Sequence, residues 1–483
     1  MSYPRIARFR SVAELRDHLA ALHAPIPLDD EPLAAAEGSP LAQPLVLGGR
    51  TVGNRWCIHP MEGWDGSPEG GPTDILIRRW RHFGLSGAKL IWGGEAVAVM
   101  NEGRANPNQL CAPACGRAGF AALLAEVKTA HREAFGRDDD LVVALQLTHS
   151  GRFSKPVASG RIPRIAYHHP LLDARHGVNP ADAACVLTDD DVERLIDAYV
   201  AAARDADAAG FDMVDLKACH GYLVHEFLSA RRRPGRFGGD FAGRTRLLVT
   251  LIERVKAECP RLLIGVRLSL FDVVPWHMVN GHGEPFPFGD ALPYDCGFGV
   301  DAHDPLAVDL AEPIALLERL RDLGVVAVNL SAGSPYTVPH VIRPAAFPPS
   351  DGYPPPEDPL LGVWRQIDAA RRAKAAVPDL VMVGSAYTYL QEYLVHAAQA
   401  TVGQGWIDAV GLGRMVLSYP ELPADSLAGR TLTRGRVCRT FSDCTTAPRH
   451  GLRSGCYPLD AFYKTLPEAA AVKEIKATME ARG

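Results

Sequence analysis

The 483-residue sequence has no apolar run long enough to cross a membrane and no cluster of basic residues. A membrane span needs about 20 consecutive apolar residues, and nucleic acids or anionic membrane surfaces are usually bound by a basic patch. The net charge of −5 at pH 7 also argues against such partners. The first ten residues lack the apolar core of a secretory signal peptide. We therefore expect a cytoplasmic protein that binds neither nucleic acid nor a membrane.

Two further features bear on the fold and on the cysteines. No Gly-x-Gly-x-x-Gly motif follows the first expected strand, which argues against a doubly wound dinucleotide-binding sheet. The ten cysteines stand in a chain without a secretory signal, which favours reduced thiols or metal ligands over disulfides. The apolar fraction of 47% and the charged fraction of 22% are those of an ordinary globular protein.

Eight short apolar runs have the length and composition of buried strands. They are Trp56–His59, Ala88–Trp92, Leu141–Leu147, Phe211–Leu216, Leu262–Leu268, Val325–Leu330, Leu380–Val383 and Ile407–Leu412. Helical patterns lie between them, among them Arg117–His131, Asp189–Ala209, Arg244–Glu258 and Glu312–Leu323. Strands that alternate with crossover helices predict a parallel α/β fold, and eight such units predict a (β/α)8 TIM barrel. A doubly wound sheet is the alternative.

We expect three parts along the chain. Residues 1–40 hold an N-terminal helix, capped by Ser11, and a linker; residues 41–430 form the barrel; residues 431–483 form a C-terminal extension with three cysteines and a terminal helix. Two long insertions, 152–186 and 271–313, follow the third and fifth strands, so they would lie at the C-terminal mouth of the barrel. The terminal helix would either cap the barrel or support a homo-oligomer.

Polar residues at the strand ends are the candidate functional groups, because the βα loops carry the chemistry of barrels. Gln146 ends the third strand and Arg267 the fifth. A buried Arg267 needs an anionic partner, either a ligand or an internal carboxylate. Small residues follow the last two strands, where barrels often bind phosphate, although a plain glycine-rich turn is the alternative. These residues are Gly384, Ser385, Ala386, Gly413 and Arg414.

Three polar side chains crowd together after the fourth strand, namely Lys217, His220 and Tyr222. A cation, an imidazole and a phenol at one strand end suggest proton transfer or stabilisation of a developing oxyanion. Each one singly is more simply a surface lysine, a core histidine or a wall tyrosine. The three together favour a functional site.

The segment Lys217–Gly239 resembles the fourth-strand motif of the old yellow enzyme family of FMN-dependent oxidoreductases. The usual pattern there is His-x-x-His/Asn-Gly-Tyr-Leu followed by an Arg-x-Gly-Gly loop. Segments that resemble the family's other strand ends follow in the expected order, at 59–62, 95–104, 146–152, 266–269 and 411–414. The resemblance extends over residues 40–465.

This resemblance implies an FMN held non-covalently at the mouth of the barrel, with NAD(P)H as co-substrate. Gln146 would bind the pyrimidine edge of the flavin, and Arg267 would face its N1 and O2 atoms. The other implied cofactor contacts are Pro60, Met61, Glu62 and Ala96 around the ring, and Gly384, Ser385, Ala386, Gly413 and Arg414 at the phosphate.

The resemblance also implies catalytic roles. Tyr222 matches the family's proton donor, and His220 matches one of the two groups that hold the substrate carbonyl oxygen. Lys217 stands in place of the second such group, a histidine, and a lysine donates hydrogen bonds but accepts none. Glu62 stands where some relatives have a Cys or Thr, and its charge should disfavour flavin reduction unless it pairs with Lys217 or is protonated. Both departures suggest a substrate other than the standard enone.

The spacing Cys438-x5-Cys444-x11-Cys456 is similar to the iron–sulfur region of longer relatives, which use Cys-x2-Cys-x3-Cys-x11/12-Cys. The internal Cys-x-x-Cys is missing, so the set is one thiolate short. Three interpretations are open: buried thiols without a cluster, an iron–sulfur cluster with Asp443 or His450 as fourth ligand, and a zinc site.

Together these features predict an oxidoreductase that transfers hydride from NAD(P)H through FMN to a carbonyl-conjugated C=C bond of a small-molecule substrate. The alternative within the family is a dehydrogenase or demethylase that runs oxidatively with an external electron acceptor. The same residues are also compatible with a Schiff-base lyase that uses Lys217, and with a barrel that binds FMN or a partner without turnover.

Overall fold

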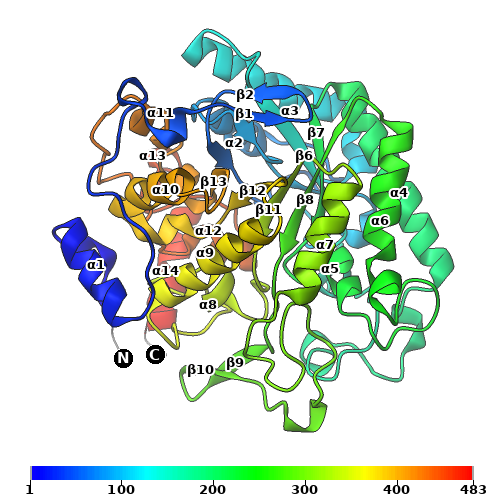
Figure 1. The fold of residues 1–483 in the computed structure, drawn as a ribbon. Coiled ribbons are helices and arrows are strands. Elements are labelled where there is room, and N and C mark those ends of the chain that lie inside the picture. Colours follow the sequence, from blue (N-terminus) through cyan, green and yellow to red (C-terminus); the bar gives the residue numbers. More distant parts are fainter. Residues whose placement is uncertain (1–2, 481–483) are drawn as a thin grey trace.

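Eight parallel strands close into a barrel in the computed structural model, which describes residues 3–480 (Figure 1). The strands are β3 (Trp56–Ile58), β4 (Leu90–Ile91), β6 (Val142–Thr148), β7 (Met213–Ala218), β8 (Leu263–Ser269), β11 (Ala327–Ser331), β12 (Val381–Gly384) and β13 (Ala409–Leu412). They pair in this order around the ring, and the pairing of β13 with β3 closes it. The predicted (β/α)8 barrel and its eight strands are confirmed.

Helices form the outer layer around the strands (Figure 1). They include α2 (Asp74–Gly84), α3 (Ala112–Phe135), α4 (Asp189–Ala209), α6 (Phe241–Glu258), α7 (Ala311–Asp322), α9 (Pro359–Ala376) and α10 (Leu394–Gly403). Helix α4 has the bounds that the sequence predicted. Thr188 caps it by accepting a hydrogen bond from the backbone N–H of Asp191, which satisfies one of the free donors of the first turn.

Short hairpins decorate the two ends of the barrel. One, of β1 (Leu45–Leu47) and β2 (Arg50–Val52), packs its apolar side chains into the N-terminal end. At the opposite end the insertion 271–313 holds the hairpin of β9 (Trp276–Val279) and β10 (His282–Pro285), seen at the bottom of Figure 1. A short strand, β5 (Ala96–Ala98), pairs with β6.

Both terminal regions contain helices. Helix α1 (Val12–Ala21) begins at the predicted cap, Ser11, whose side chain accepts a hydrogen bond from the backbone N–H of Glu14. The C-terminal extension holds α12 (Asp443–Arg449), α13 (Ala461–Lys464) and α14 (Glu468–Glu480). An ion pair of 2.6 Å between Lys476 and Asp443 ties α14 to α12.

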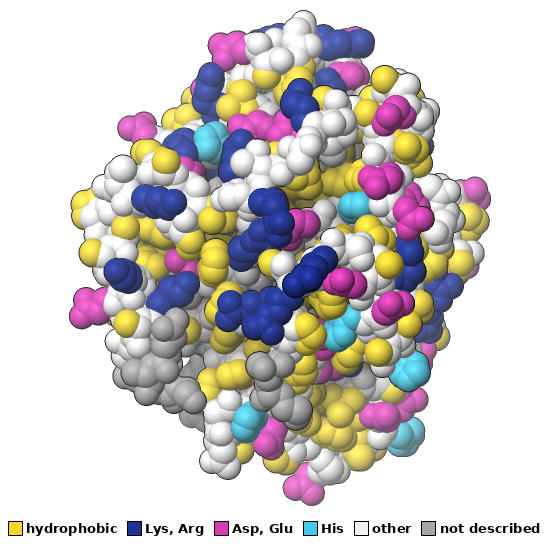
Figure 2. Space-filling model, turned by 90° about the vertical axis from the view of Figure 1, so that its left-hand side faces the viewer, with side chains coloured by type: hydrophobic (Ala, Val, Ile, Leu, Met, Phe, Trp, Pro, Cys, Tyr) yellow, Lys and Arg dark blue, Asp and Glu magenta, His cyan; other side chains and the backbone are white. Residues whose placement is uncertain are grey.

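Charges of both signs are interspersed over the face shown in Figure 2, and several Lys and Arg side chains gather near its centre. This mixed surface fits the small net charge of −5. Among the helices described, none is both long enough and apolar enough to span a lipid bilayer.

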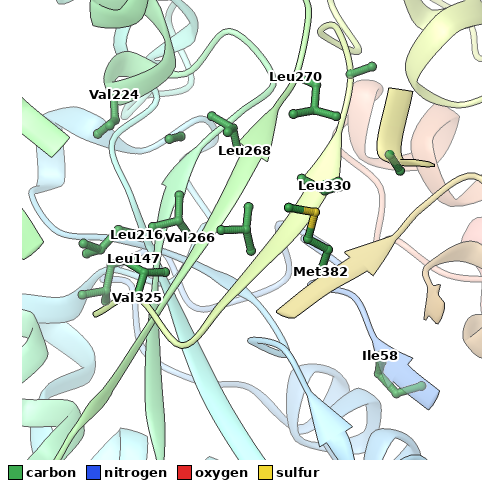
Figure 3. Packing of buried hydrophobic residues seen from close by; sticks show 14 of the residues in the cluster. Ile58, Leu147, Leu216, Val224, Val266, Leu268, Leu270, Val325, Leu330 and Met382 are labelled. Atoms are coloured by element: carbon green, nitrogen blue, oxygen red, sulfur yellow. The ribbon is translucent and has the colours of Figure 1, made fainter. Parts of the chain in front are cut away.

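Alternate side chains of each strand point outward and pack beneath the helices, because successive strand residues face opposite sides. Leu216, Val266, Leu268, Leu330 and Met382 come from four neighbouring strands and belong to one buried apolar cluster (Figure 3). This cluster joins the barrel to its helical layer.

The remaining side chains of the strands face the barrel interior, and their polarity changes along each strand. Near the N-terminal ends they are apolar, with Cys57, Leu90, Trp92, Val142, Ala144, Met213, Ala327, Val383 and Ala409 in one cluster. Two positions further along β3, β6, β7, β8 and β11 the same face becomes polar. These positions are His59, Gln146, Asp215, Arg267 and Asn329. The period of two therefore gives the barrel an apolar lower half and a polar upper half.

Gly411 of β13 lies beside His59, which directly follows the neighbouring strand β3, and a Cβ added at Gly411 would lie 1.9 Å from the imidazole. We expect Gly411→Ala to lower the free energy of unfolding by about 1–3 kcal/mol through overpacking, measured by chemical denaturation. Gly435→Ala is the matched control, because a Cβ at Gly435 meets no atom within 4 Å. Equal stability of the two variants would contradict the packing described here.

Candidate functional site

Neighbouring strands bring the polar inward side chains into rows at the C-terminal end of the barrel. Gln146 pairs in register with Asp215, and Lys217 pairs with Arg267. Arg267 pairs in turn with Asn329 of β11. Adjacent strands lie about 4.8 Å apart, so these residues form one continuous polar floor. Lys217 is therefore a residue of β7 itself, whereas the sequence placed it just after the strand.

Asp215 is fully buried and accepts hydrogen bonds from both neighbouring strands. Gln146 Nε2 donates to its Oδ2 at 2.5 Å, and the backbone N–H of Arg267 donates to its Oδ1 at 2.6 Å. Burial raises the pKa of Asp215 to about 6, although these donors and the Arg267 charge oppose the shift. Asp215 thus holds in place two residues that the sequence analysis had singled out.

The Arg267 guanidinium lines the cavity above the polar floor. Its Nε atom is buried without a hydrogen-bond partner, and no carboxylate of residues 3–480 lies within ion-pair distance of it. Asp215 acts on Arg267 only at longer range. The internal Arg–carboxylate pair considered from the sequence is therefore not observed. A buried cation left without a partner favours binding of an electron-rich ligand.

Glu62 connects three side chains in the same cavity. Its Oε2 lies 3.4 Å from Lys217 Nζ and accepts a hydrogen bond from the Tyr222 hydroxyl at 3.3 Å, while Trp64 Nε1 donates to its Oε1 at 2.8 Å. Lys217 Nζ also lies 3.8 Å from the centre of the Tyr222 ring, within cation–π range. The pairing of Glu62 with Lys217, one of the two conditions raised for an anion at this position, is thus present.

Tyr222 is buried, and its hydroxyl lies 3.2 Å from that of Tyr336. Burial, the Glu62 carboxylate and Tyr336 raise the pKa of Tyr222 well above its usual value. The phenol therefore stays protonated at neutral pH. A protonated, desolvated hydroxyl that faces a cavity can donate a proton to a bound molecule.

His220 has a left-handed backbone conformation, with φ of 68°. Its Nε2 lies 3.0 Å from Ser331 Oγ, and Ser269 Oγ accepts the hydrogen bond of its backbone N–H at 3.1 Å. Desolvation and the charges of Arg267 and Lys217 hold the pKa of His220 well below its usual value. The ring is therefore neutral, with one N–H to donate and one nitrogen to accept.

A cavity of about 730 Å³, called here the central cavity, brings about half of the predicted site residues together. The predicted residues that line it are Pro60, Glu62, Gln146, Lys217, His220, Tyr222, Arg267 and Cys444. Trp64, Tyr336 and Arg449 form part of its wall, and the Arg449 guanidinium lies 4.9 Å from the Trp64 ring centre and 4.6 Å from that of Tyr336.

A second cavity of about 910 Å³, the side cavity, shares His220, Arg267 and Arg343 with the central cavity. Predicted residues found only here are Met61, Ser385, Ala386, Gly413 and Arg414. Besides Arg267 Nε, three further guanidinium atoms of its lining are buried without partners, namely Nε and Nη2 of Arg343 and Nη1 of Arg414. Burial and the neighbouring Arg414 lower the pKa of Arg343 to about 10. Two adjacent cations with unused donors are suited to bind a phosphate or carboxylate.

His59 anchors the floor of the side cavity. Its Nδ1 lies 3.0 Å from Asn329 Nδ2 and its Nε2 lies 3.0 Å from Ser385 Oγ. Burial and Arg267 lower the pKa of His59 well below its usual value, so it is neutral. Ser385, predicted as a phosphate contact, is therefore held by His59 and by the Leu330 carbonyl, to which it donates at 2.6 Å.

Two predicted cofactor contacts line neither cavity. Ala96 is buried in β5, where it pairs in register with Gln146. Gly384 ends β12, and a Cβ there would lie 2.7 Å from Ile407 and 3.3 Å from Tyr387. Ala96 is thus a direct neighbour of Gln146, which does line the central cavity.

The three cysteines of the C-terminal extension do not form a recognisable metal centre. Within residues 3–480, no group of three or more His, Cys, Asp or Glu side chains is arranged to hold a metal ion. Burial raises the pKa of Cys438 to about 11 and also raises that of Cys456, so both are neutral thiols at pH 7. Cys444 differs from these two, since it lines both cavities. The structure thus favours the interpretation of thiols without a cluster.

Five residues of the site were not predicted from the sequence, namely Arg343, Arg449, Tyr336, Trp64 and Asp215. Arg343 and Tyr336 belong to the Pro-rich stretch after β11, and Arg449 ends α12, so no strand-end pattern marks them. Trp64 lies two residues after Glu62, so the segment 59–62 that resembles the family could have pointed to it. Asp215 is a carboxylate inside an apolar strand run, which is a usable signal for a buried polar contact.

Comparison with known proteins gives consistent matches. Residues 40–280 match the model of the NADH:flavin oxidoreductase / NADH oxidase family. The chain is 27% identical over 432 residues to an NADH:flavin oxidoreductase of Gibberella zeae, which covers 85% of this chain and 91% of that protein. It is 24% identical over 290 residues to an NADH oxidase of Thermoanaerobacter brockii, covering 60% of this chain and 36% of that protein.

Solved structures also resemble the barrel. An old yellow enzyme homologue from Zymomonas mobilis superposes with a TM-score of 0.55 at 24% identity, over 81% of this chain and 94% of that one. A 2-naphthoyl-CoA reductase complex superposes with a TM-score of 0.63 at 16% identity, over 90% of this chain and 58% of that one. At sequence identities this low, the similarity to these two structures shows a shared fold and no more.

The raised pKa of Asp215 makes a prediction about stability and pH. Its folded-state pKa of about 6 lies above the ordinary value of 3.8, so its bound proton stabilises the fold below about pH 4, and this contribution is lost as the pH rises through 6. At 1.36 kcal/mol per unit, we expect the free energy of unfolding of the wild type to fall by about 2 kcal/mol relative to Asp215→Asn between pH 4 and 7.

Thermal or urea unfolding of both proteins across this range checks the expectation. Exposed Asp379→Asn is the matched control and should track the wild type. A difference between wild type and Asp215→Asn that does not vary with pH would contradict a proton held by Asp215.

Proposed function

The chain belongs to the NADH:flavin oxidoreductase family, also called the old yellow enzyme family, and from this membership and the site geometry we propose that it reduces carbonyl-conjugated C=C bonds. It is an oxidoreductase that uses FMN and NAD(P)H. The observation that carries the further proposal is the protonated Tyr222 hydroxyl beside His220, in a cavity that opens onto the Arg267 guanidinium.

The cavity residues fit a bound FMN. The unpartnered Arg343 and Arg414 atoms of the side cavity supply donors for its phosphate, and the buried Nε of Arg267 supplies positive charge for its ring. Gly413 leaves room there, since a Cβ would meet Met61 Sδ at 3.3 Å. Gln146 lines the central cavity as a further ring contact. Bound FMN supplies a two-electron carrier between NAD(P)H and the substrate.

His220 and Lys217 bind the substrate carbonyl in this proposal. The neutral His220 ring donates one hydrogen bond, and its other contact, Ser331, fixes the ring orientation at 3.0 Å. Lys217 adds a positive charge next to the oxygen that becomes electron-rich during reduction. Because Glu62 lies 3.4 Å from Lys217, the pair presents little net charge to a neutral enone.

Tyr222 delivers the proton to the substrate carbon. Its hydroxyl donates a hydrogen bond to Glu62 at 3.3 Å, and both residues line the central cavity, so Glu62 sets the direction of the hydroxyl hydrogen. Tyr336, 3.2 Å away, can return a proton to Tyr222 after each turnover. Glu62 has two roles here, since it orients Tyr222 and balances the charge of Lys217.

A second function, oxidation of an amine with an external electron acceptor, is favoured by one observation. The Glu62 carboxylate stands among the aromatic rings of Trp64, Tyr222 and Tyr336, a setting that attracts cations. Lys217 and Arg449 already provide the cations there, which argues for the reductive direction. Anaerobic mixing distinguishes the two: bleaching of the flavin by amines rather than by NAD(P)H would support oxidation.

Arg343 provides a test of the cofactor site. We expect Arg343→Met to weaken FMN binding at least tenfold, because a charge-assisted contact is worth about 1.5–3 kcal/mol. Titration of the apoprotein with FMN, followed by quenching of flavin fluorescence, measures the dissociation constant. The exposed Arg372→Met of α9 is the matched control. Unchanged affinity in Arg343→Met would exclude Arg343 from the cofactor site.

Tyr222→Phe tests the proton donor. We expect the rate of alkene reduction to fall about 100-fold, since a positioned general acid contributes 10²–10⁴, while the rate at which NAD(P)H bleaches the flavin stays within about twofold of the wild type. Stopped-flow absorbance separates the two half-reactions. Tyr393→Phe is the control, because the Tyr393 hydroxyl donates a hydrogen bond to the carbonyl of Phe9, a residue distant in the sequence. Full alkene reduction by Tyr222→Phe would remove this role from Tyr222.

A further inference from the structure

A third cavity of about 980 Å³, called here the outer cavity, adjoins the central cavity and shares Trp64, Tyr336 and Arg449 with it. Its charged lining residues come from three segments outside the repeating βα units. Lys155 and Arg161 belong to the insertion 152–186, Asp351 and Tyr336 to the Pro-rich stretch after β11, and Arg449 to α12. A molecule whose reacting part lies in the central cavity can extend past Trp64 and Arg449 into this space.

The outer cavity is positively charged. Lys155, Arg161 and Arg449 carry three positive charges, and Asp351 is the acidic residue among its described lining. The Oδ2 atom of Asp351 lies 2.8 Å from Nε of Arg449, so Asp351 offsets the positive charge of Arg449. Two net positive charges remain, in a protein whose overall charge is −5. General basicity of the chain does not explain this concentration.

Neither Lys155 nor Arg161 forms an ion pair with a described residue. Arg161 Nη1 lies 2.5 Å from His176 Nδ1. Burial and the nearby arginines lower the pKa of His176 to about 3, so this partner is neutral, and the nearest acidic influence on Arg161 is Asp351 at longer range. Three cations that share one carboxylate are a poor arrangement for stability alone, because the cations repel one another.

Arg449 is held ready at the junction of the two cavities. Its guanidinium lies against the Trp64 and Tyr336 rings, at 4.9 and 4.6 Å from their centres, and its contact with Asp351 fixes its direction. A guanidinium stacked in this way keeps its in-plane N–H groups available to an incoming anion. Preorganisation of this kind reduces the entropy lost on binding.

We propose that the outer cavity binds an anionic group, a carboxylate or phosphate, of the small molecule that reacts in the central cavity, with Lys155, Arg161 and Arg449 as its ligands. This inference rests on the proposed function for the location of the reacting part. The anion has two chemical sources, the acceptor substrate itself or the 2′-phosphate of NADPH. In either case the outer cavity determines which molecules the enzyme prefers.

Binding of benzoate and its neutral analogue benzamide to the FMN-loaded protein tests the cavity without requiring turnover. We expect the wild type to prefer benzoate, and the double variant Lys155→Met/Arg161→Met to lower the ratio of the two affinities at least tenfold by calorimetry. Added salt should lower the wild-type ratio as well. Lys473→Met/Arg372→Met, at two exposed positions, is the matched control and should behave as the wild type.

Steady-state kinetics then identify the source of the anion. If NADPH supplies it, the double variant raises the KM ratio of NADPH to NADH at least tenfold; if the acceptor supplies it, the variant raises the KM of a carboxylate-bearing enone relative to its neutral parent. Benzoate and benzamide affinities that keep the wild-type ratio in the double variant would overturn the proposal. If the double variant loses the preference for benzoate but the wild type reduces no alkene, the proposed function is overturned and the anion site stands.

Discussion

A strand in a closed barrel can send only every second side chain to the interior, and the site described here depends on this constraint. The inward positions of β3, β6, β7, β8 and β11 are apolar in their first half and polar in their second. The apolar half excludes water and gives the barrel a rigid base. The polar half is fixed in register by neighbouring strands, so Gln146, Asp215 and Arg267 are positioned by backbone hydrogen bonding rather than by loops.

The two departures from the family pattern compensate each other. A lysine introduced alone at position 217 would leave a buried charge, and a glutamate introduced alone at position 62 would oppose reduction of a neighbouring flavin. Together they form a pair at 3.4 Å, and Tyr222 and Trp64 satisfy the remaining carboxylate positions. A buried pair of this kind is costly to break and nearly neutral when intact, so we interpret Glu62 and Lys217 as one unit.

The barrel could be predicted from the sequence because buried strands are short apolar runs that end in glycine or polar residues, and all eight lie where those runs lie. The strand-end residues could be predicted for the same reason. Arg343, Tyr336 and Arg449 could not, because they lie in irregular segments whose position depends on tertiary packing rather than on periodicity. The cysteine spacing showed the opposite problem: a familiar interval remains in the sequence, while the structure of residues 3–480 arranges no metal centre from it.

The C-terminal extension contributes Cys444 and Thr445 to both inner cavities and Ser454 to the side cavity. The eight barrel strands end at Leu412, so these three residues belong to a segment outside the repeating βα units. A chain shortened before position 444 would keep every strand of the barrel and lose part of the wall of both inner cavities. Part of the pocket is therefore encoded separately from the fold that carries it.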